Sequence, residues 1–350
     1  MPSSRQKSKS ALRVLAVLIG VALLAYLVEK AGLANLLQNA KTIGWGMLAV
    51  LALAGVAHMV KTFAWRFVLL DEANKISVWR TLGLRLISEA IAQLGFVGLV
   101  FGESTRVALL GSEIPVATAV SSVTLDRGLF IVTGAVVTII GIVLVILMAA
   151  ISGGLRLFAV LSVLALLFLL SLAVLAVHKG WPLFSGTARA LGRIPWFRSW
   201  INKQQAVTES AERQFLQFHR RVPRAFWASL ILNFATHLFA VAEVYLILHL
   251  LGVHASFVGA LIFESLTKLI NVIGAVNPGN LGTYEGGNMV IGKLLGLGGA
   301  QGLTLGLCRR FRSIFWAAVG AICLAWYSRS NQPARPDQSA EIVTGANICN

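Results

Sequence analysis

The sequence has few charged side chains and very few aspartates. Lysine, arginine, aspartate and glutamate make up 13% of the 350 residues, about half the share that is usual in soluble domains. The only aspartates are Asp71, Asp126 and Asp337, which excludes a paired-aspartate metal site of the kind used in nucleotide-sugar chemistry. The scarcity of charge therefore points away from a soluble protein.

Common catalytic motifs are also missing. No glycine-rich loop ends in Lys-Ser or Lys-Thr, so an ATP-driven motor is excluded. There is no Gly-x-Ser-x-Gly elbow and no His-Glu-x-x-His helix. The three cysteines, Cys308, Cys323 and Cys349, have neither metal-ligand spacing nor a paired framework. We therefore expect no enzyme activity, no metal and no cofactor.

What the chain does have is long apolar sequence. Hydrophobic residues make up 57% of it, and the mean hydropathy is +0.78. Continuous runs of this kind predict membrane-spanning helices and not barrel strands. The runs lie near 14–28, 46–70, 117–150, 154–178, 226–252 and 299–327. The sequence thus predicts an all-α polytopic membrane protein with about six full spans.

The net charge of +16 indicates cytoplasmic loops and anionic lipid head groups, and we expect no nucleic acid partner. The segment from Lys179 to Arg224 carries nine basic residues against two acidic ones. The positive-inside rule places this loop and the basic N-terminus in the cytoplasm. An uncleaved N-terminal anchor is favoured over a signal peptide, because no convincing cleavage site follows the first apolar run.

Two apolar but interrupted segments, 77–113 and 257–296, resemble each other. A shift of 182 residues, the separation between Glu103 and Glu285, also brings Arg127 onto Arg309. Each half then consists of a spanning helix, a broken segment and another spanning helix. The charge rule orients the halves oppositely, as in transporters built from inverted repeats, whose substrate site lies where the broken segments meet. Each broken segment is either a re-entrant hairpin or two complete spans.

These observations predict five parts of the chain. They are an N-terminal anchor and connector (1–45), the first inverted repeat (46–150), a linking span with a basic cytoplasmic loop (151–225), the second inverted repeat (226–328) and a disordered tail (329–350).

The second broken segment reads AVNPGNLGTYEGG. Pro278 disfavours a helix at Asn277, while Gly279 and Gly282 permit a turn. We expect a helix to resume near Thr283 with Glu285 in its first turn. Glu285 then either only caps this helix or lies beside backbone N–H groups that hold a phosphate.

The first broken segment, QLGFVGLVFGESTR, supplies Glu103 and Arg106 but has no proline. About one helix length after each acid come further charges, Asp126-Arg127 and Arg309-Arg310. Ionisable groups at that depth should pair or face a cavity. A structural glutamate–arginine ion pair within each half and direct contact with a substrate are both open.

Other charges have simpler interpretations. Glu264 and Lys268 are spaced i, i+4, which predicts a local ion pair at the membrane surface, and Lys61 and Arg66 are expected to snorkel. The candidate substrate-binding residues are Glu103, Arg106, Asp126, Arg127, Glu264, Asn277, Pro278, Gly279, Gly282, Glu285, Arg309 and Arg310.

The run from Glu264 to Gly320 resembles the C-terminal signature of the lysylphosphatidylglycerol synthase transmembrane family, also described as flippase-like proteins. The matching features are Pro278-Gly279, Leu281-Gly282, Glu285-Gly286 and Arg309-Arg310-x-Arg312, and GESTRVALLG and LDRGLF are similar to its first-half signatures. The resemblance implies a bacterial inner-membrane protein that moves a lipid between leaflets, and it is strongest to the branch found beside hopanoid-lipid genes. It also implies that the chain lacks the soluble domain that makes lysyl-lipid.

Three functions follow from these patterns. The leading hypothesis is a lipid translocator or scramblase that binds an amphipathic lipid, with or without a phosphate head, in a polar groove between the halves. The second is a non-transporting accessory subunit that docks a lipid-modifying enzyme through the 179–224 loop. The least favoured is a transferase acting on polyprenyl-linked sugars, because suitable acids are missing.

Overall fold

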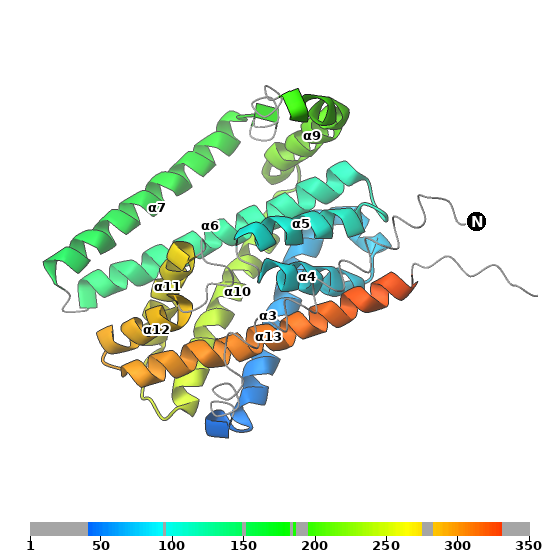
Figure 1. Ribbon diagram of the computed structural model, residues 1–350. Helices are drawn as coiled ribbons and strands as arrows, with labels where there is room; N and C mark the ends of the chain where they lie inside the picture. The colour runs from blue at the N-terminus through cyan, green and yellow to red at the C-terminus, as the bar shows by residue number, and fades with distance from the viewer. Residues whose placement is uncertain are drawn as a thin grey trace, which may run out of the picture.

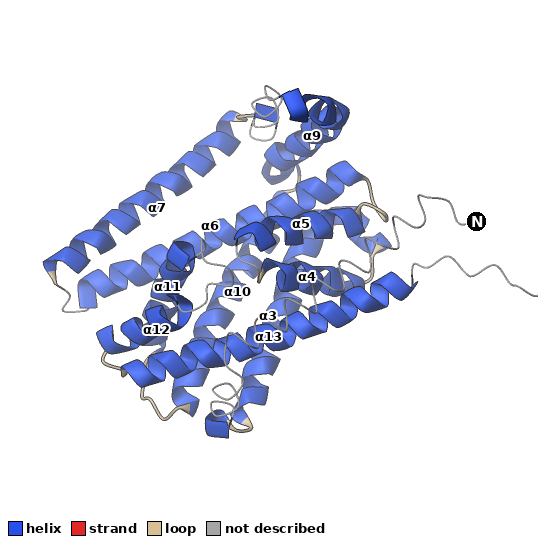
Figure 2. Cartoon of the chain, in the orientation of Figure 1, coloured by secondary structure: helices blue, strands red, loops and turns tan. Residues whose placement is uncertain are grey.

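The computed structural model describes residues 41–93, 96–148, 152–182, 185–186, 195–274 and 283–330, and within these ranges every regular element is a helix (Figure 2). The elements in chain order are α3 (Gly46–Leu69), the 3-10 helix η1 (Leu70–Lys75), α4 (Val78–Ala92), α5 (Phe96–Leu110), α6 (Val116–Met148), α7 (Gly153–Lys179), α9 (Pro195–Arg221), α10 (Pro223–Leu250), α11 (Phe257–Gly274), α12 (Thr283–Leu294) and α13 (Gly299–Ser330).

Six helices of the described part are long and apolar enough to cross a membrane: α3 with η1, α6, α7, α10, α11 and α13. This confirms the predicted all-α polytopic membrane protein. The expected N-terminal span and most of the expected disordered tail lie outside the described residues. The helix α11, which the sequence placed in a broken segment, is the sixth member of this set.

Local sequence explains where several helices begin and end. Ser77 precedes α4, and its side chain accepts a hydrogen bond from the backbone N–H of Arg80, which satisfies one of the free donors of the first turn. Gly180 follows α7 with φ at 65°, a left-handed conformation that glycine adopts without a steric penalty. Pro223 is the first residue of α10, where its missing N–H costs nothing.

The helix order of the first half repeats in the second. With the offset of 182 residues, α4 falls on residues 260–274, which belong to α11, and α6 falls on residues 298–330, which include α13. The pairs α3 and α10, and α5 and α12, also correspond. The long helices α6 and α13 run in opposite directions across the molecule (Figure 1), so the two halves are inverted.

The halves are interlocked by close helix contacts. The start of α3 meets the end of α10, because a Cβ built on Gly46 would lie 2.6 Å from Leu250 Cδ2. The first helix of each broken segment packs on the long helix of the other half: α11 on α6 and α4 on α13. In the second of these contacts, a Cβ on Gly320 would lie 2.4 Å from the Leu86 carbonyl oxygen.

The first broken segment is a hairpin that returns to the end of the bundle from which it started (Figure 1). Its helices α4 and α5 have 15 residues each and are therefore about 22 Å long, shorter than the roughly 30 Å hydrocarbon core of a bilayer. The two helices touch closely, since a Cβ on Gly102 would lie 2.4 Å from the Ser88 carbonyl oxygen. This geometry is that of a re-entrant hairpin and not of two full spans.

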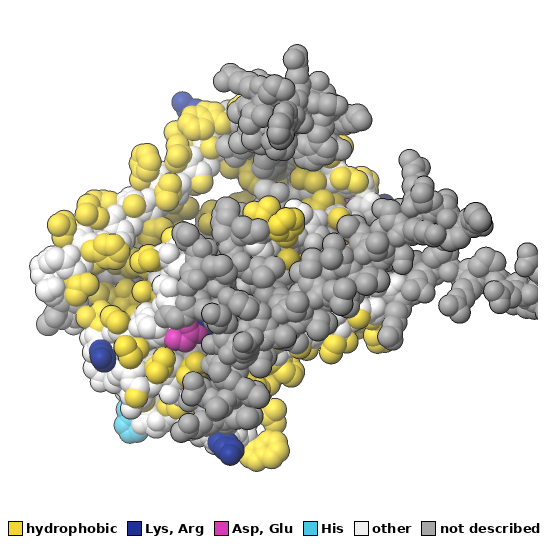
Figure 3. Space-filling view, in the orientation of Figure 1, with side chains coloured by type: hydrophobic (Ala, Val, Ile, Leu, Met, Phe, Trp, Pro, Cys, Tyr) yellow, Lys and Arg dark blue, Asp and Glu magenta, His cyan; other side chains and the backbone are white. Residues whose placement is uncertain are grey.

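The helix α7 packs on α6 and diverges from the other helices of the bundle toward its C-terminal end (Figure 1). Only Ala159 and Ala176 of its residues are buried, and hydrophobic side chains cover its surface (Figure 3). Its apolar residues therefore suit contact with lipid chains on most sides. The helix α9 instead packs on α6 and buries Ala211 and Phe218.

The close contact between α6 and α11 predicts that a methyl group added at Gly141 of α6 lowers the stability of the protein. A Cβ on Gly141 would lie 2.0 Å from Ser265 Oγ and 3.3 Å from the Leu261 carbonyl oxygen of α11, whereas Gly128 on the same helix has nothing within 4 Å. We expect Gly141→Ala to destabilise the protein by about 1–3 kcal/mol and Gly128→Ala to be neutral or slightly stabilising. Thermal unfolding in detergent measures both, and equal transition temperatures for the two variants would contradict the described packing.

Candidate functional site

A cavity of about 570 Å³ lies between the two halves, among α3, α4, α6, α10, α11 and α13. Charged side chains from both halves line it at the depth of the apolar spans. Five are cationic and three are acidic: Lys61, Arg127, Lys268, Arg309 and Arg312 against Glu89, Glu243 and Glu264. With neutral histidines, the lining therefore carries two positive charges in excess.

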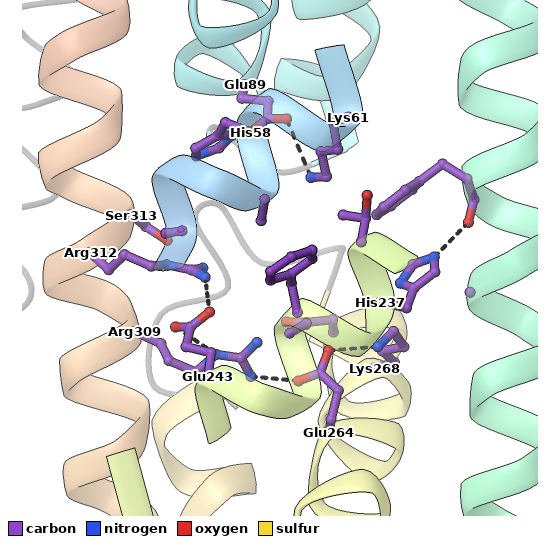
Figure 4. A pocket seen from close by; sticks show the side chains of 18 of the residues that line it. His58, Lys61, Glu89, His237, Glu243, Glu264, Lys268, Arg309, Arg312 and Ser313 are labelled. Atoms are coloured by element: carbon purple, nitrogen blue, oxygen red, sulfur yellow. Dashed lines mark hydrogen bonds and ion pairs between the residues drawn. The ribbon is translucent and has the colours of Figure 1, made fainter. Parts of the chain in front are cut away.

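The first ionic group comes from the first half (Figure 4). Glu89 of α4 lies between two residues of α3, with its Oε2 3.2 Å from His58 Nδ1 and its Oε1 3.4 Å from Lys61 Nζ. The His58 ring in turn contacts Trp316 of α13, with 4.9 Å between ring centroids. Burial of Glu89 is therefore offset by contacts with two basic side chains.

The second ionic group comes from the second half and is separate from the first in Figure 4. Glu264 Oε2 lies 2.8 Å from Arg309 Nη1, and Glu264 Oε1 accepts a hydrogen bond of 2.6 Å from Lys268 Nζ. Arg309 Nε is 3.5 Å from Glu243 Oε1, and Arg312 Nη1 donates to the other oxygen of Glu243. One turn of helix separates Arg309 from Arg312, so both reach the same carboxylate.

Arg127 of α6 differs from the other arginines of the cavity. No described acid lies within ion-pair distance of it, and its buried Nε has no hydrogen-bond partner among the described residues. Its guanidinium carbon is 5.7 Å from the centre of the Phe130 ring, and Lys61 Nζ is 4.7 Å from the same centre. His237 Nε2 donates to the Phe130 carbonyl oxygen over 3.0 Å, which holds this turn of α6 against α10.

Apolar side chains also line the cavity. They include Leu53, Ile131, Leu166, Phe239 and Val272, and Leu166 belongs to α7. Ile131 and Val272 are 56% and 73% exposed, so the cavity is continuous with the apolar surface of the bundle. The lining thus combines charged side chains from both halves with apolar side chains, one of which comes from α7.

A second charged cluster lies deeper in the first half. Asp126 Oδ2 is 2.8 Å from both Arg85 Nη2 and Arg106 Nη2, and Glu103 Oε2 is 3.2 Å from Arg106 Nη1. The Arg106 guanidinium carbon is 3.5 Å from the centre of the Trp65 ring, a favourable cation–π contact. Only a hollow of about 20 Å³ borders this cluster, so its role is to join α4, α5 and α6.

In the second half, the link between α11 and α12 is a hydrogen bond between neutral side chains, in addition to the ion pairs of Glu243 and Glu264 with α13. Thr267 Oγ1 donates to Asn288 Oδ1 over 3.0 Å, and Asn288 Nδ2 donates to the Tyr284 carbonyl oxygen. A further ion pair is present here, because Arg310 Nη2 donates to Glu285 Oε1 over 2.6 Å. Glu285 lies in the first turn of α12, Thr283–Leu294, and the residues that precede this helix lie outside the described part of the chain.

The structure distributes the predicted site residues over three places. Arg127, Glu264 and Arg309 line the main cavity. Glu103, Arg106 and Asp126 belong to the cluster with Arg85, whereas Glu285 and Arg310 pair with each other outside the main cavity. The four residues of the second break, Asn277, Pro278, Gly279 and Gly282, lie outside the described residues.

Two expectations about charged residues are wrong. Glu264 and Lys268 do form the expected ion pair, but both line the central cavity and not the membrane surface, because they lie in the middle of α11. Lys61 does not snorkel, since its ammonium group contacts Glu89. Arg66 also turns inward and donates to the carbonyl oxygens of Ala73 and Ile76.

Within each half a glutamate–arginine pair exists, with Arg106 for Glu103 and Arg310 for Glu285. Sequence reasoning missed Glu89 and Glu243. Glu243 had a usable signal, because it is an ionisable residue inside the apolar run 226–252. Among the described residues, no group of three or more potential ligands is placed to hold a metal ion.

The buried cluster predicts a large stability effect. Asp126→Asn would leave Arg85 and Arg106 without their shared carboxylate, at an expected cost of about 3–5 kcal/mol. Glu113→Gln is the matched control, because its pair with Arg80 is partly exposed and should contribute about 0–1 kcal/mol. Thermal unfolding in detergent measures both, and a loss for Asp126→Asn as small as that of the control would show that the cluster does not stabilise the fold.

The lysylphosphatidylglycerol synthase TM region family matches the chain over residues 13–320, a range that includes every helix lining the cavity. No curated protein and no solved structure matches it. The family gives the chain a role connected with membrane lipids, whereas the narrower resemblance to a hopanoid-associated branch stays a prediction. The chain is therefore a multi-pass membrane protein that belongs to the lysylphosphatidylglycerol synthase TM region family.

Proposed function

We propose that the protein moves an amphipathic lipid between the two leaflets of a membrane. The observation that carries this proposal is the mixed lining of the central cavity, which has charged side chains from both halves and apolar side chains that include Leu166 of α7. A lipid head group needs polar partners when it leaves water, whereas its acyl chains do not. The head group would bind the charged side chains while the acyl chains pass the apolar ones.

Alternating access would come from rocking of one half against the other. The two ionic groups support this movement because each is built mainly within one half. Glu89 is held by α3 and α4, and Glu264 is held by α11 and α13. Rocking would change the distance between the groups while each keeps its internal ion pairs, so little electrostatic energy would be lost during exchange.

The proposed setting is the inner membrane of a bacterium, with the end of the bundle that carries the basic 179–224 loop in the cytoplasm. The helix α9 lies at that end and presents Arg213, Arg220 and Arg221 beside its packed face. An accessory role in docking a lipid-modifying enzyme through α9 is the alternative proposal. It predicts copurification with such an enzyme and no lipid movement by the isolated protein.

Filling the cavity should stop transport without disturbing any ion pair. Ala135 lines the cavity, and Ala135→Phe is expected to lower the translocation rate of a fluorescent phospholipid in proteoliposomes at least about tenfold by occupying the path of the head group. Ala165 on α7 is exposed and lies outside the cavity lining, so Ala165→Phe is the matched control. Dithionite quenching of the label in the outer leaflet measures the rate.

Equal transport by the two variants would remove the cavity from the path. No transport by the unmodified protein with any phospholipid tested would contradict the proposed function itself.

A further inference from the structure

The two halves place the same arginine in different electrostatic surroundings. Under the 182-residue offset, Arg127 of α6 corresponds to Arg309 of α13. Arg309 is held by two carboxylates, with Glu264 Oε2 at 2.8 Å and Glu243 Oε1 at 3.5 Å. Arg127 has no acid within ion-pair distance in the described part of the chain.

The sequence explains this difference. The first-half counterparts of Glu243 and Glu264 are Lys61 and Leu82. One acid is thus replaced by a base and the other by an apolar residue. The positions that the two carboxylates occupy around Arg309 therefore hold no acid around Arg127, although Glu89, Glu103 and Asp126 line the same small hollow as Arg127 beyond ion-pair distance.

Lys61 adds a second cation at the same place. Lys61 Nζ and the Arg127 guanidinium carbon lie 4.7 Å and 5.7 Å from the centre of one ring, that of Phe130. Lys61 has a single acid contact, at 3.4 Å, and that acid, Glu89, also contacts His58. An ammonium group has three donors, so Lys61 keeps capacity for another acceptor.

Two cations beside one ring within the membrane-spanning helices need a counter-charge. Arg127 Nε is buried and lacks a hydrogen-bond partner among the described residues, as does Arg309 Nε. Because Arg309 contacts two carboxylates and Arg127 contacts none in the described part of the chain, it is the Arg127 guanidinium that keeps donors for a ligand. A phosphate fits this need, because its oxygens accept bidentately from arginine and also from an ammonium group. The apolar lining next to Arg127, including Ile131 and Leu166, suits acyl chains attached to that phosphate.

We propose that Lys61 and Arg127 clamp the phosphate of a lipid head group beside Phe130. The phosphate would lie next to Arg127 as the carboxylates of Glu243 and Glu264 lie next to Arg309. This inference rests on the proposed function and specifies its substrate class as phosphate-bearing lipids. The second half would supply a wall whose three cations, Lys268, Arg309 and Arg312, all contact Glu243 or Glu264, and the first half would supply the binding groups.

The test compares two lipids that differ only in the phosphate. Phosphatidic acid and diacylglycerol with identical short acyl chains are titrated into the purified full-length protein in detergent, and bound lipid is counted by native mass spectrometry. We expect phosphatidic acid to bind at least about tenfold more tightly. Arg127→Gln and Lys61→Gln should each remove most of this preference, because a hydrogen bond to a charged group is worth about tenfold or more.

Two further variants control the result. Lys75→Gln removes a lysine whose side chain is 59% exposed and pairs with Glu72 outside the cavity, and it should leave the preference unchanged. Arg127→Lys keeps the charge but loses the planar fork, so its preference should be intermediate. If Arg127→Gln does not give a monodisperse protein, Arg127→Lys and Lys61→Gln decide the question.

Equal binding of the two lipids, or an unchanged preference in the Arg127 and Lys61 variants, would overturn the clamp. Inorganic phosphate that binds as tightly as phosphatidic acid would assign the site to the free ion and overturn the lipid proposal. If the protein transports lipids in proteoliposomes but does not prefer lipids that carry a phosphate, the clamp is contradicted and the proposed function is not. If it prefers phosphatidic acid in binding but transports no lipid, the proposed function is contradicted and the clamp is not.

Discussion

A charged side chain at membrane depth must meet an opposite charge or water, because the hydrocarbon core offers neither. The arrangement of this protein follows from that constraint. Its spans carry Lys61, Asp126, Glu243, Glu264 and Arg309, and every one of these turns toward the interior of the bundle and contacts a partner. Inversion of the two halves supplies the interior that these groups require, since it brings both broken segments toward the same central space.

The two halves have the same order of helices but place their ion pairs differently. In the first half, Asp126 and its two arginines join the hairpin to α6. In the second half, ion pairs of Glu264 and Glu285 join α11 and α12 to α13, and the neutral pair Thr267 and Asn288 joins α11 to α12. In the cavity, Arg309 has two acid partners, whereas Arg127 has none within ion-pair distance among the described residues. A symmetric framework therefore carries an asymmetric binding surface, which suits a substrate with one charged end.

The sequence predicted five of the six spans in the described part of the chain and the offset between the halves, because apolar length and paired charges are local signals. It did not predict which side chains meet. The helix α10 is apolar on nearly every face, so the spacing of its apolar residues does not show which face points inward. The contact between Glu243 and Arg312 could therefore not be predicted. Glu89 was missed for a related reason, since only the packing of α4 against α3 brings it to Lys61.

The central claim is that an internal cavity between inverted halves is wet while α7 faces lipid. Thiol accessibility tests it most directly. In a variant whose three native cysteines are replaced by serine, Ala135→Cys and Ala165→Cys are treated with a membrane-impermeant thiol reagent in native membranes. The account predicts rapid labelling at position 135 and none at position 165. Equal protection of both positions would contradict a water-accessible cavity and the lipid pathway built on it.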